Sequence, residues 1–181
     1  HGKDPPLCDE HGGLGLFIEA LRALRAIVER LRLRLNEEKT HIRRLPEESV
    51  DFLGYTIGRC YRSRTGGAYI GTRPSRKSRQ RILRAISEQS SRRWLPMEAE
   101  VLVQRLNRLL VGWSNYFKLG SVTRTYRAIE MHTCYRLRRW LCWKHKLGGK
   151  GFTRFPDDYL YQTLGLVRLQ TLQRSFPWAK A

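Results

Sequence analysis

The sequence predicts an α+β protein, with a helix and a small antiparallel sheet in the first 72 residues and an all-helical second half. Three observations support this fold class. Apolar residues recur at helical spacing over about 16–32, β-rich runs fill about 50–72, and a 3.6-residue period holds from about 75 to 147. The 181 residues, 41% of them apolar, are enough for one domain or two small ones with a real core.

The first fifty residues are predicted to form a loop, a helix and a short strand. Residues 1–15 hold two prolines and four glycines without a period, which is typical of a loop. Leu31, Leu33 and Leu35 alternate with arginines and predict a short half-buried strand. Between these segments, the helix over about 16–32 is indicated by apolar residues spaced by four and three: Phe17, Leu21, Leu24, Val28 and Leu31.

The segment SVDFLGYTIGRCYRSRTGGAYIG (49–71) predicts strands and a hairpin that turns near Gly66-Gly67. Three amphipathic helices follow, over about 75–92, from Leu95-Pro96 to about 117, and over about 123–147. Their period therefore accounts for nearly the whole second half of the chain.

The apolar spacing of the second helix predicts which residues of VGWSNYFKLG (111–120) are buried and which are exposed. Trp113 falls on the apolar stripe, and we expect it in the core with Leu106 and Trp140. Asn115 falls on the opposite side and is expected to be exposed beside Arg108. Gly112 costs about 1 kcal/mol relative to alanine inside a helix, so we expect another group to approach closely there.

The charge indicates a polyanionic partner. The formal net charge is +19 and the isoelectric point is near 10.6. Residues 1–50 are neutral overall, whereas residues 73–149 contain eighteen basic and four acidic side chains. Such an excess repels itself unless a polyanion binds, so the second half is predicted to meet that partner.

The basic residues of the second half lie opposite the apolar stripes. The alternative that they only contact solvent is disfavoured because so few acidic residues accompany them. Arginine also outnumbers lysine, which suits bidentate contacts to phosphate and stacking on bases. The predicted binding residues are Arg73, Lys77, Arg81, Arg84, Arg108, Asn115, Arg124, Arg127, Arg138, Arg139 and Lys146.

No catalytic residue and no metal site are predicted. His132, Cys134, Cys142 and His145 are the best metal candidates, but a helix separates the two cysteines by about 12 Å and points His132 elsewhere. The scattered cysteines and the first residues, which lack a signal-peptide pattern, favour a reducing, cytosolic setting. No apolar run approaches the ~18 residues of a membrane span, so no membrane partner is expected.

Several motifs, in this order, resemble the C-terminal part of a group II intron-encoded reverse transcriptase–maturase. LRLRLNEEKTHI (31–42) and VDFLGYTIG (50–58) are similar to the end of the family's palm and its primer grip. TRPSRKSRQRILRAI (72–86) resembles the first thumb helix. LNRLLVGWSNYF (106–117) matches the maturase-specific signature closely, and YRLRRWLCWKHK (135–146) continues it. The resemblance covers about residues 16–170.

This resemblance implies three regions. Residues 1–72 would be a truncated palm remnant with a primer-grip-like hairpin at Phe52, Leu53, Gly54 and Tyr55. Residues 73–118 would be thumb-like helices, and residues 119–181 a maturase-specific helical extension. The family's polymerase uses an Asp pair and two divalent ions just before the helix at 16–32, where this chain has HGKDPPLC. The chain would then be a fragment or a degenerate product, and we expect no polymerisation and no cofactor from it alone.

The resemblance implies an RNA-binding maturase module that holds group II intron RNA, or a primer–template duplex, in support of splicing and mobility. Two alternatives stay open. The chain could complete an active RNA-directed DNA polymerase with a palm supplied by another chain, which would bring magnesium with it, or it could be a basic DNA-binding module. The expected compartment is cytoplasmic, of bacterial type or within an organelle, with nucleoid association as an alternative.

Overall fold

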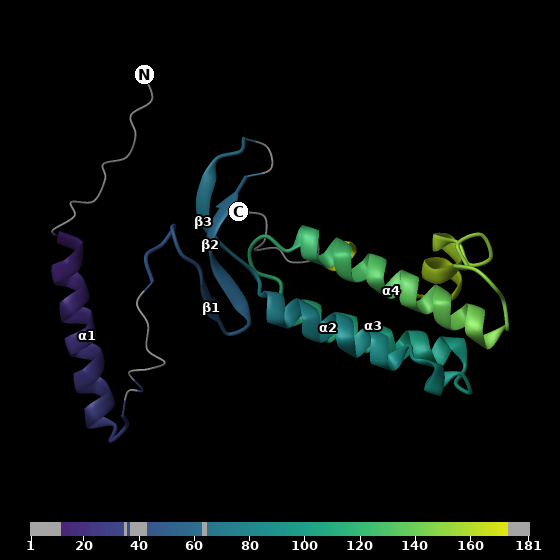
Figure 1. Cartoon of the computed structure of the whole chain (residues 1–181), viewed down its shortest axis with the longest axis horizontal. Helices are drawn as coiled ribbons and strands as arrows, with labels where there is room; N and C mark the ends of the chain where they lie inside the picture. The colour runs from purple at the N-terminus through teal and green to yellow at the C-terminus, as the bar shows by residue number, and fades with distance from the viewer. Residues whose placement is uncertain (1–11, 35, 37–42, 63–64, 174–181) are drawn as a thin grey trace. The chain divides into compact units, whose positions relative to one another are not determined.

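The structure is a computed structural model that describes residues 12–34, 36, 43–62 and 65–173. The chain divides into two compact units, residues 1–42 and residues 43–181, and each is described by itself (Figure 1). Within the described residues, no helix combines the length and apolar character that crossing a bilayer requires.

The first unit contains helix α1 (Gly12–Arg30), where the sequence predicts a helix. The strand predicted over 31–35 is wrong for its described part. Leu33 N donates to Val28 O and Arg32 N to Glu29 O, with Arg32 at φ 56°, so the chain closes the helix in a Schellman-type turn. The alternating leucines therefore belong to a helix end, and Leu35 lies outside the described residues.

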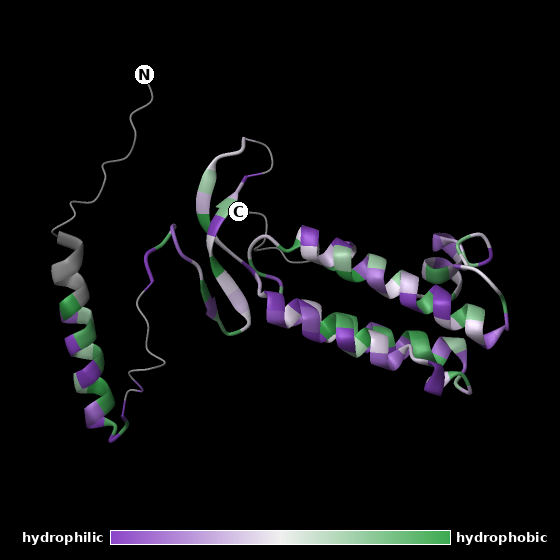
Figure 2. Ribbon diagram, viewed as in Figure 1, coloured by the Kyte–Doolittle hydropathy of each residue, from purple (hydrophilic) through white to green (hydrophobic). Residues whose placement is uncertain are grey.

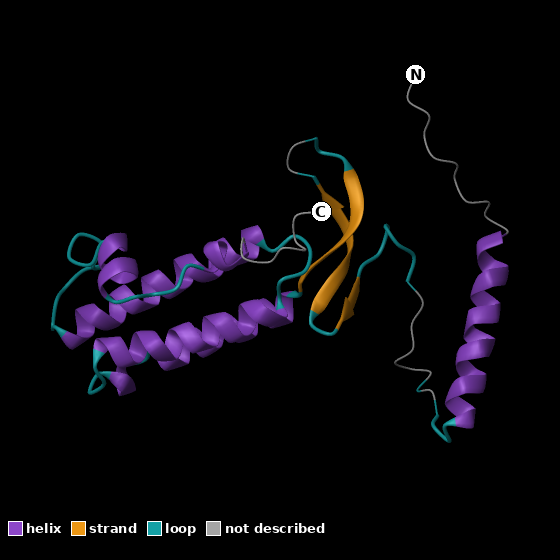
Figure 3. Ribbon diagram, turned by 180° about the vertical axis from the view of Figure 1, so that it is seen from behind, coloured by secondary structure: helices purple, strands orange, loops and turns teal. Residues whose placement is uncertain are grey.

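The second unit begins with an antiparallel sheet in the order β1-β2-β3, made of β1 (Val50–Phe52), β2 (Tyr55–Tyr61) and β3 (Ala68–Pro74) (Figure 3). Phe52 pairs with Tyr55, which leaves a two-residue turn of Leu53 (φ 48°) and Gly54 (φ 79°). Positive φ at both positions is the type I′ arrangement that matches the twist of paired strands. The predicted hairpin near Gly66-Gly67 is confirmed between β2 and β3.

Helices α2 (Arg76–Gln89), α3 (Ala99–Tyr116) and α4 (Thr123–Lys144) follow, and no strand occurs among the described residues of 75–147. The second predicted helix begins later than Leu95-Pro96. A 3₁₀ turn, η1 (Arg92–Trp94), and the bond from Met97 N to Trp94 O occupy that segment first. The described part of the second unit is thus a small sheet joined to a helical bundle, in agreement with the predicted α+β class.

The core lies between the apolar stripes of the three helices (Figure 2). Leu106 and Trp140 are fully buried, as predicted, and Tyr126 of α4 joins them. Trp113 is only partly buried and packs at the edge of this core, so its predicted place inside it is wrong. Its ring instead packs against Phe117 and Tyr126, with centroids 4.6 and 5.9 Å away.

The chain after α4 completes the core. It folds back along the bundle through a π-helical turn, η2 (Tyr159–Thr163), and a short helix, α5 (Leu169–Gln173), that contacts α3 and α4. Leu160 and Leu169 are fully buried in the same core as Trp140. This segment covers part of α4 that would otherwise face solvent.

Candidate nucleic-acid interface

The outer face of α2 is basic along its length. Ser75 Oγ accepts the Ser78 N–H and caps the start of the helix. Ile82 and Ile86 are buried, and this fixes the rotation of the helix about its axis. Lys77, Arg81 and Arg84 are therefore exposed on the opposite side, as the sequence predicts.

A shallow groove of about 200 Å³ runs between α2 and α4. Arg76 and Arg79 line it from α2, and Thr125 and Ala128 line it from α4. Both arginines are exposed, and the sequence analysis did not select them. Their spacing of three in RKSRQR puts them on one side of a helix, but only the position of α4 shows that this side is the groove.

Polar contacts hold α2 and α4 together beyond the groove. Ser87 Oγ and His132 Nε2 share a hydrogen bond of 2.9 Å. The Arg136 guanidinium donates to Ser87 O and Ser90 O at 2.8 and 3.1 Å, which satisfies carbonyls at the end of α2. Arg136 therefore has a structural role, because it fixes the end of α2 against α4.

Burial affects the titration of His132. Removal of the imidazole from water lowers its pKa, and the nearby charge of Arg136 lowers it further, while a contact with the Leu83 carbonyl partly opposes them. The imidazole is therefore neutral at pH 7, and it adds no positive charge to this surface.

The outer face of α4 exposes Arg124, Arg127 and Arg139, and Lys146 is exposed just after the helix. The Arg139 guanidinium lies 5.0 Å from the centroid of the Trp143 ring, which Arg92 also approaches at 4.7 Å. These predicted residues are accessible to a ligand in the unit described here.

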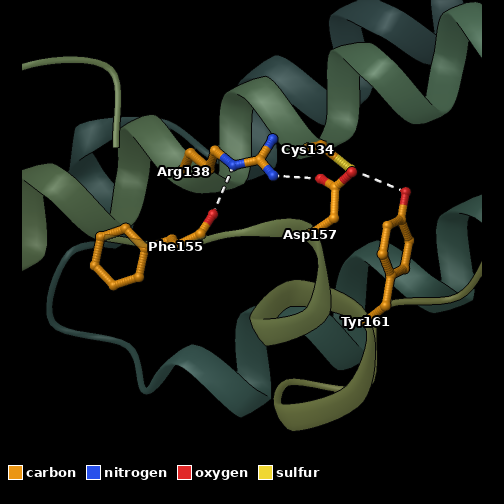
Figure 4. A network of polar contacts seen from close by, with 5 residues as sticks. All are labelled: Cys134, Arg138, Phe155, Asp157 and Tyr161. Carbon is orange, nitrogen blue, oxygen red and sulfur yellow. Dashed lines mark hydrogen bonds and ion pairs between the residues drawn. The ribbon is translucent and has the colours of Figure 1, made fainter. Parts of the chain in front are cut away.

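The prediction that Arg138 belongs to this exposed surface is wrong. Its side chain is buried, with 6% of its surface accessible, because the chain after α4 lies over it. Arg138 Nε donates to Phe155 O at 2.7 Å, and its Nη2 forms an ion pair with Asp157 (Figure 4). The guanidinium also lies over the Phe152 ring. Arg138 thus anchors the returning segment to α4.

Beside Arg138, the Cys134 thiol and the Tyr161 hydroxyl share a hydrogen bond of 3.1 Å (Figure 4). Burial raises the pKa of the Cys134 thiol and also that of the Tyr161 hydroxyl. Both groups consequently keep their protons at neutral pH.

The exposed stripe of α3 carries Arg108, Gly112 and Asn115, so the predicted exposure of Asn115 is confirmed. A Cβ added at Gly112 would have no atom within 4 Å. No described part of the chain therefore makes the close approach that Gly112 was expected to permit.

The primer-grip-like turn is joined to the end of α3. Tyr55 Oη donates to Tyr116 O at 2.6 Å, and Tyr116 Oη donates to Leu53 O at 2.9 Å. Gly54 O accepts hydrogen bonds from Ser75 N and Ser78 Oγ. Phe52 and Leu53 remain exposed, at 61% and 66% of their surface. The turn thus presents two apolar side chains while hydrogen bonds hold its backbone.

Arg73, the predicted binding residue at the end of β3, is exposed as well. Its Nη1 donates to Arg59 O across the β2–β3 pair at 3.3 Å. The same nitrogen also lies 3.9 Å from Cys60 Sγ, so both contacts come from Nη1 of this five-donor side chain.

Among the described residues, no group of His, Cys, Asp and Glu side chains could hold a metal ion. His132 contacts α2, whereas Cys134, two residues later, contacts Tyr161 after α4. The two candidate ligands therefore point to different neighbours.

The exposed arginines of α2 and α4 give the second unit a positively charged surface. Residues 79–155 match the family described as the group II intron, maturase-specific domain. The match runs from α2 through α4 to Phe155, whose carbonyl Arg138 holds. This similarity is consistent with the C-terminal part of a group II intron maturase, and it supports a group II intron maturase role. A search of curated proteins finds no match.

Proposed function

We infer that this chain is an RNA-binding module of a group II intron maturase, which holds intron RNA in support of splicing and mobility. The observation that carries this inference is the placement of exposed basic residues along α2 and α4, inside the segment that matches the maturase-specific domain. Phosphate groups are the natural partner of such a surface because arginine forms paired hydrogen bonds with them.

The binding mode follows from the chemistry of the surface. Contacts to RNA phosphates release counterions, so the affinity should fall steeply with salt, with a log–log slope of about −0.7 to −0.9 per contact. Arg81 and Arg84 are suitable probes, since both are exposed on α2 and no ion pair involves them among the described residues.

The test is a filter-binding titration of group II intron RNA over a salt series. The double variant Arg81→Gln/Arg84→Gln should bind more weakly and flatten the slope by about one to two units. The matched control is Arg22→Gln/Arg30→Gln, which removes the same charge from exposed positions of α1. Equal slopes for the α2 variant and the parent would contradict the inference.

The same titration with duplex DNA distinguishes a maturase module from a basic DNA-binding module. We expect folded intron RNA to bind more tightly than duplex DNA at every salt concentration. A preference for the duplex would favour the DNA-binding alternative.

Polymerisation and its metal requirement are tested by primer extension with magnesium. We expect no extension by this chain alone and no need for a cofactor in RNA binding. Extension that appears only when a palm segment is added would support a completed polymerase.

A further inference from the structure

A second hollow, separate from the α2–α4 groove, lies between α4 and the chain that returns over it. Its volume is about 560 Å³, within the range of small-ligand sites. Glu130, Met131 and Cys134 line it from α4, and Tyr161 and Arg168 line it from the returning segment. Figure 4 shows how Cys134 and Tyr161 meet near the Arg138–Asp157 pair.

The hollow has apolar and planar walls that protein atoms leave uncovered. Met131 exposes 65% of its surface and Phe152 exposes 54%, although both are large apolar side chains. The Arg168 guanidinium lies over the Tyr161 ring, 3.9 Å from its centroid, as a cation–π pair. Such walls suit a flat ring system that can stack on them.

The charges of the hollow favour an anion. Its two carboxylates already have partners, because Glu130 accepts hydrogen bonds from Gln170 N and Nε2 and Asp157 pairs with Arg138. Arg127 and Arg168 are exposed there, and neither forms an ion pair among the described residues. The three arginines of the lining outnumber its two carboxylates, so the net charge attracts an anion.

The buried polar groups offer hydrogen bonds to a ring edge. The Tyr161 hydroxyl and the Cys134 thiol share a hydrogen bond that uses one of their two protons, so the other proton can be donated to a ligand. The Glu130 carboxylate oxygens have further lone pairs with which to accept. A flat ring with polar edges, attached to a phosphate, is a nucleotide.

We propose that this hollow binds one unpaired nucleotide, with its base against Met131 and Phe152 and its phosphate at Arg127 and Arg168. The proposal rests on the proposed function and adds to it. The basic faces hold RNA phosphates irrespective of pairing, whereas this site accepts only a base that has left a helical stack. Recognition of unstacked bases by aromatic and arginine side chains is common among RNA-binding proteins.

The test compares the full chain and its variants on two RNAs of equal charge, a single-stranded oligonucleotide containing 2-aminopurine and a fully paired duplex. Met131→Ala removes an exposed apolar wall and should weaken single-strand binding by about tenfold while leaving duplex binding unchanged. Quenching of 2-aminopurine, which reports stacking, should decrease with it. Ile27→Ala, which also truncates a large exposed apolar side chain but on α1, is the control and should bind like the parent.

A second variant tests the phosphate end of the site. Arg168→Gln should weaken single-strand binding and flatten its salt slope by about 0.7 units, again without an effect on the duplex. An equal loss of affinity for both RNAs, or no loss for either, would overturn the nucleotide site. The Arg81/Arg84 experiment would still test the proposed function independently. Failure of the parent chain to bind any RNA would overturn both.

Discussion

The Arg138 side chain is a buried cation whose charge is met by one carboxylate and one carbonyl. Its neighbour Arg139 is exposed and lies over an aromatic ring. These adjacent arginines differ because the returning segment covers only one of them. They therefore offer a matched pair for separating stability from binding.

We predict that Arg138→Gln lowers the free energy of unfolding by about 1–3 kcal/mol, because Phe155 O loses its donor and Asp157 its partner. Arg139→Gln should change it by no more than about 0.5 kcal/mol, as expected for a surface position. Urea denaturation followed by circular dichroism measures both. A parent-like midpoint for the Arg138 variant would mean that the returning segment is not held this way.

His132 gives the fold a dependence on pH. Its pKa is lowered in the folded state, so between the folded pKa and the unfolded value near 6.5 the unfolded chain binds more protons. The stability from the neutral imidazole is present above about pH 6.5 and is lost as the pH falls through the folded pKa. We predict that the melting temperature decreases on acidification, and less so in His132→Gln.

The measurement is thermal unfolding at several pH values between about 8 and 5. His145→Gln, which removes an imidazole from an exposed position, is the control. The same pH dependence of the melting temperature in the parent and in His132→Gln would show that other groups cause the loss of stability at low pH.

At the scale of elements, the junction between the sheet and the bundle depends on the α3–α4 loop. Gly120 has φ 75°, and Ser121 N donates to Thr72 O of β3 at 2.9 Å. A Cβ at Gly120 would lie 2.2 Å from that same carbonyl oxygen. The loop must therefore be glycine here for the backbone to reach the strand.

We predict that Gly120→Ala destabilises the protein by at least about 1–3 kcal/mol, from the strained φ and the clash with Thr72. Gly112→Ala is the matched control, because it lies in a helix with open space around it, and it should stabilise by about 0.5–1 kcal/mol. Chemical denaturation of both variants tests this pair. If Gly120→Ala leaves the free energy of unfolding unchanged, then the contact between this loop and β3 does not contribute to stability.

The helices of the second half could be predicted from the sequence because each buries one stripe, and burial of that stripe sets both the period and the phase. Around the axis of α4, Arg138 lies on the same side as Arg124 and Arg127, so the helical period alone predicts that it is exposed to solvent. Its burial depends on Phe155 and Asp157, which lie on a segment without a helical or strand period. The strand predicted from Leu31 and Leu33 was wrong for a related reason, because a Schellman turn has no periodic pattern of apolar residues that would identify it.

The sequence also could not reveal the two hollows. Each is formed by segments distant in the chain, such as Met131 and Arg168 around the second one. Similarly, the contacts of Tyr55 with Tyr116 join residues sixty-one positions apart. A pattern read along one segment identifies a face, whereas a site requires the position of the segment that meets it.

For the whole molecule, the division of the chain leads to a prediction about autonomy. Residues 43–181 contain the sheet, the bundle and the returning segment, and their buried core draws on no residue before position 43 among those described. α1 exposes Ile18, Leu24 and Ile27, so it contributes no buried cluster of its own among the described side chains. Stability and RNA binding should accordingly both belong to the second unit.

We predict that residues 43–181 alone unfold cooperatively and bind intron RNA with the salt slope of the full chain. The physical reason is that the basic faces of α2 and α4 lie entirely within this unit, while residues 1–50 carry no net charge. Calorimetry and the salt-series titration of this fragment are the measurements, and the full chain is the reference. Removal of a segment without net charge cannot by itself weaken the attraction of a basic surface for RNA. A fragment that folds but loses most of the salt dependence of RNA binding would therefore place phosphate contacts in the first 42 residues.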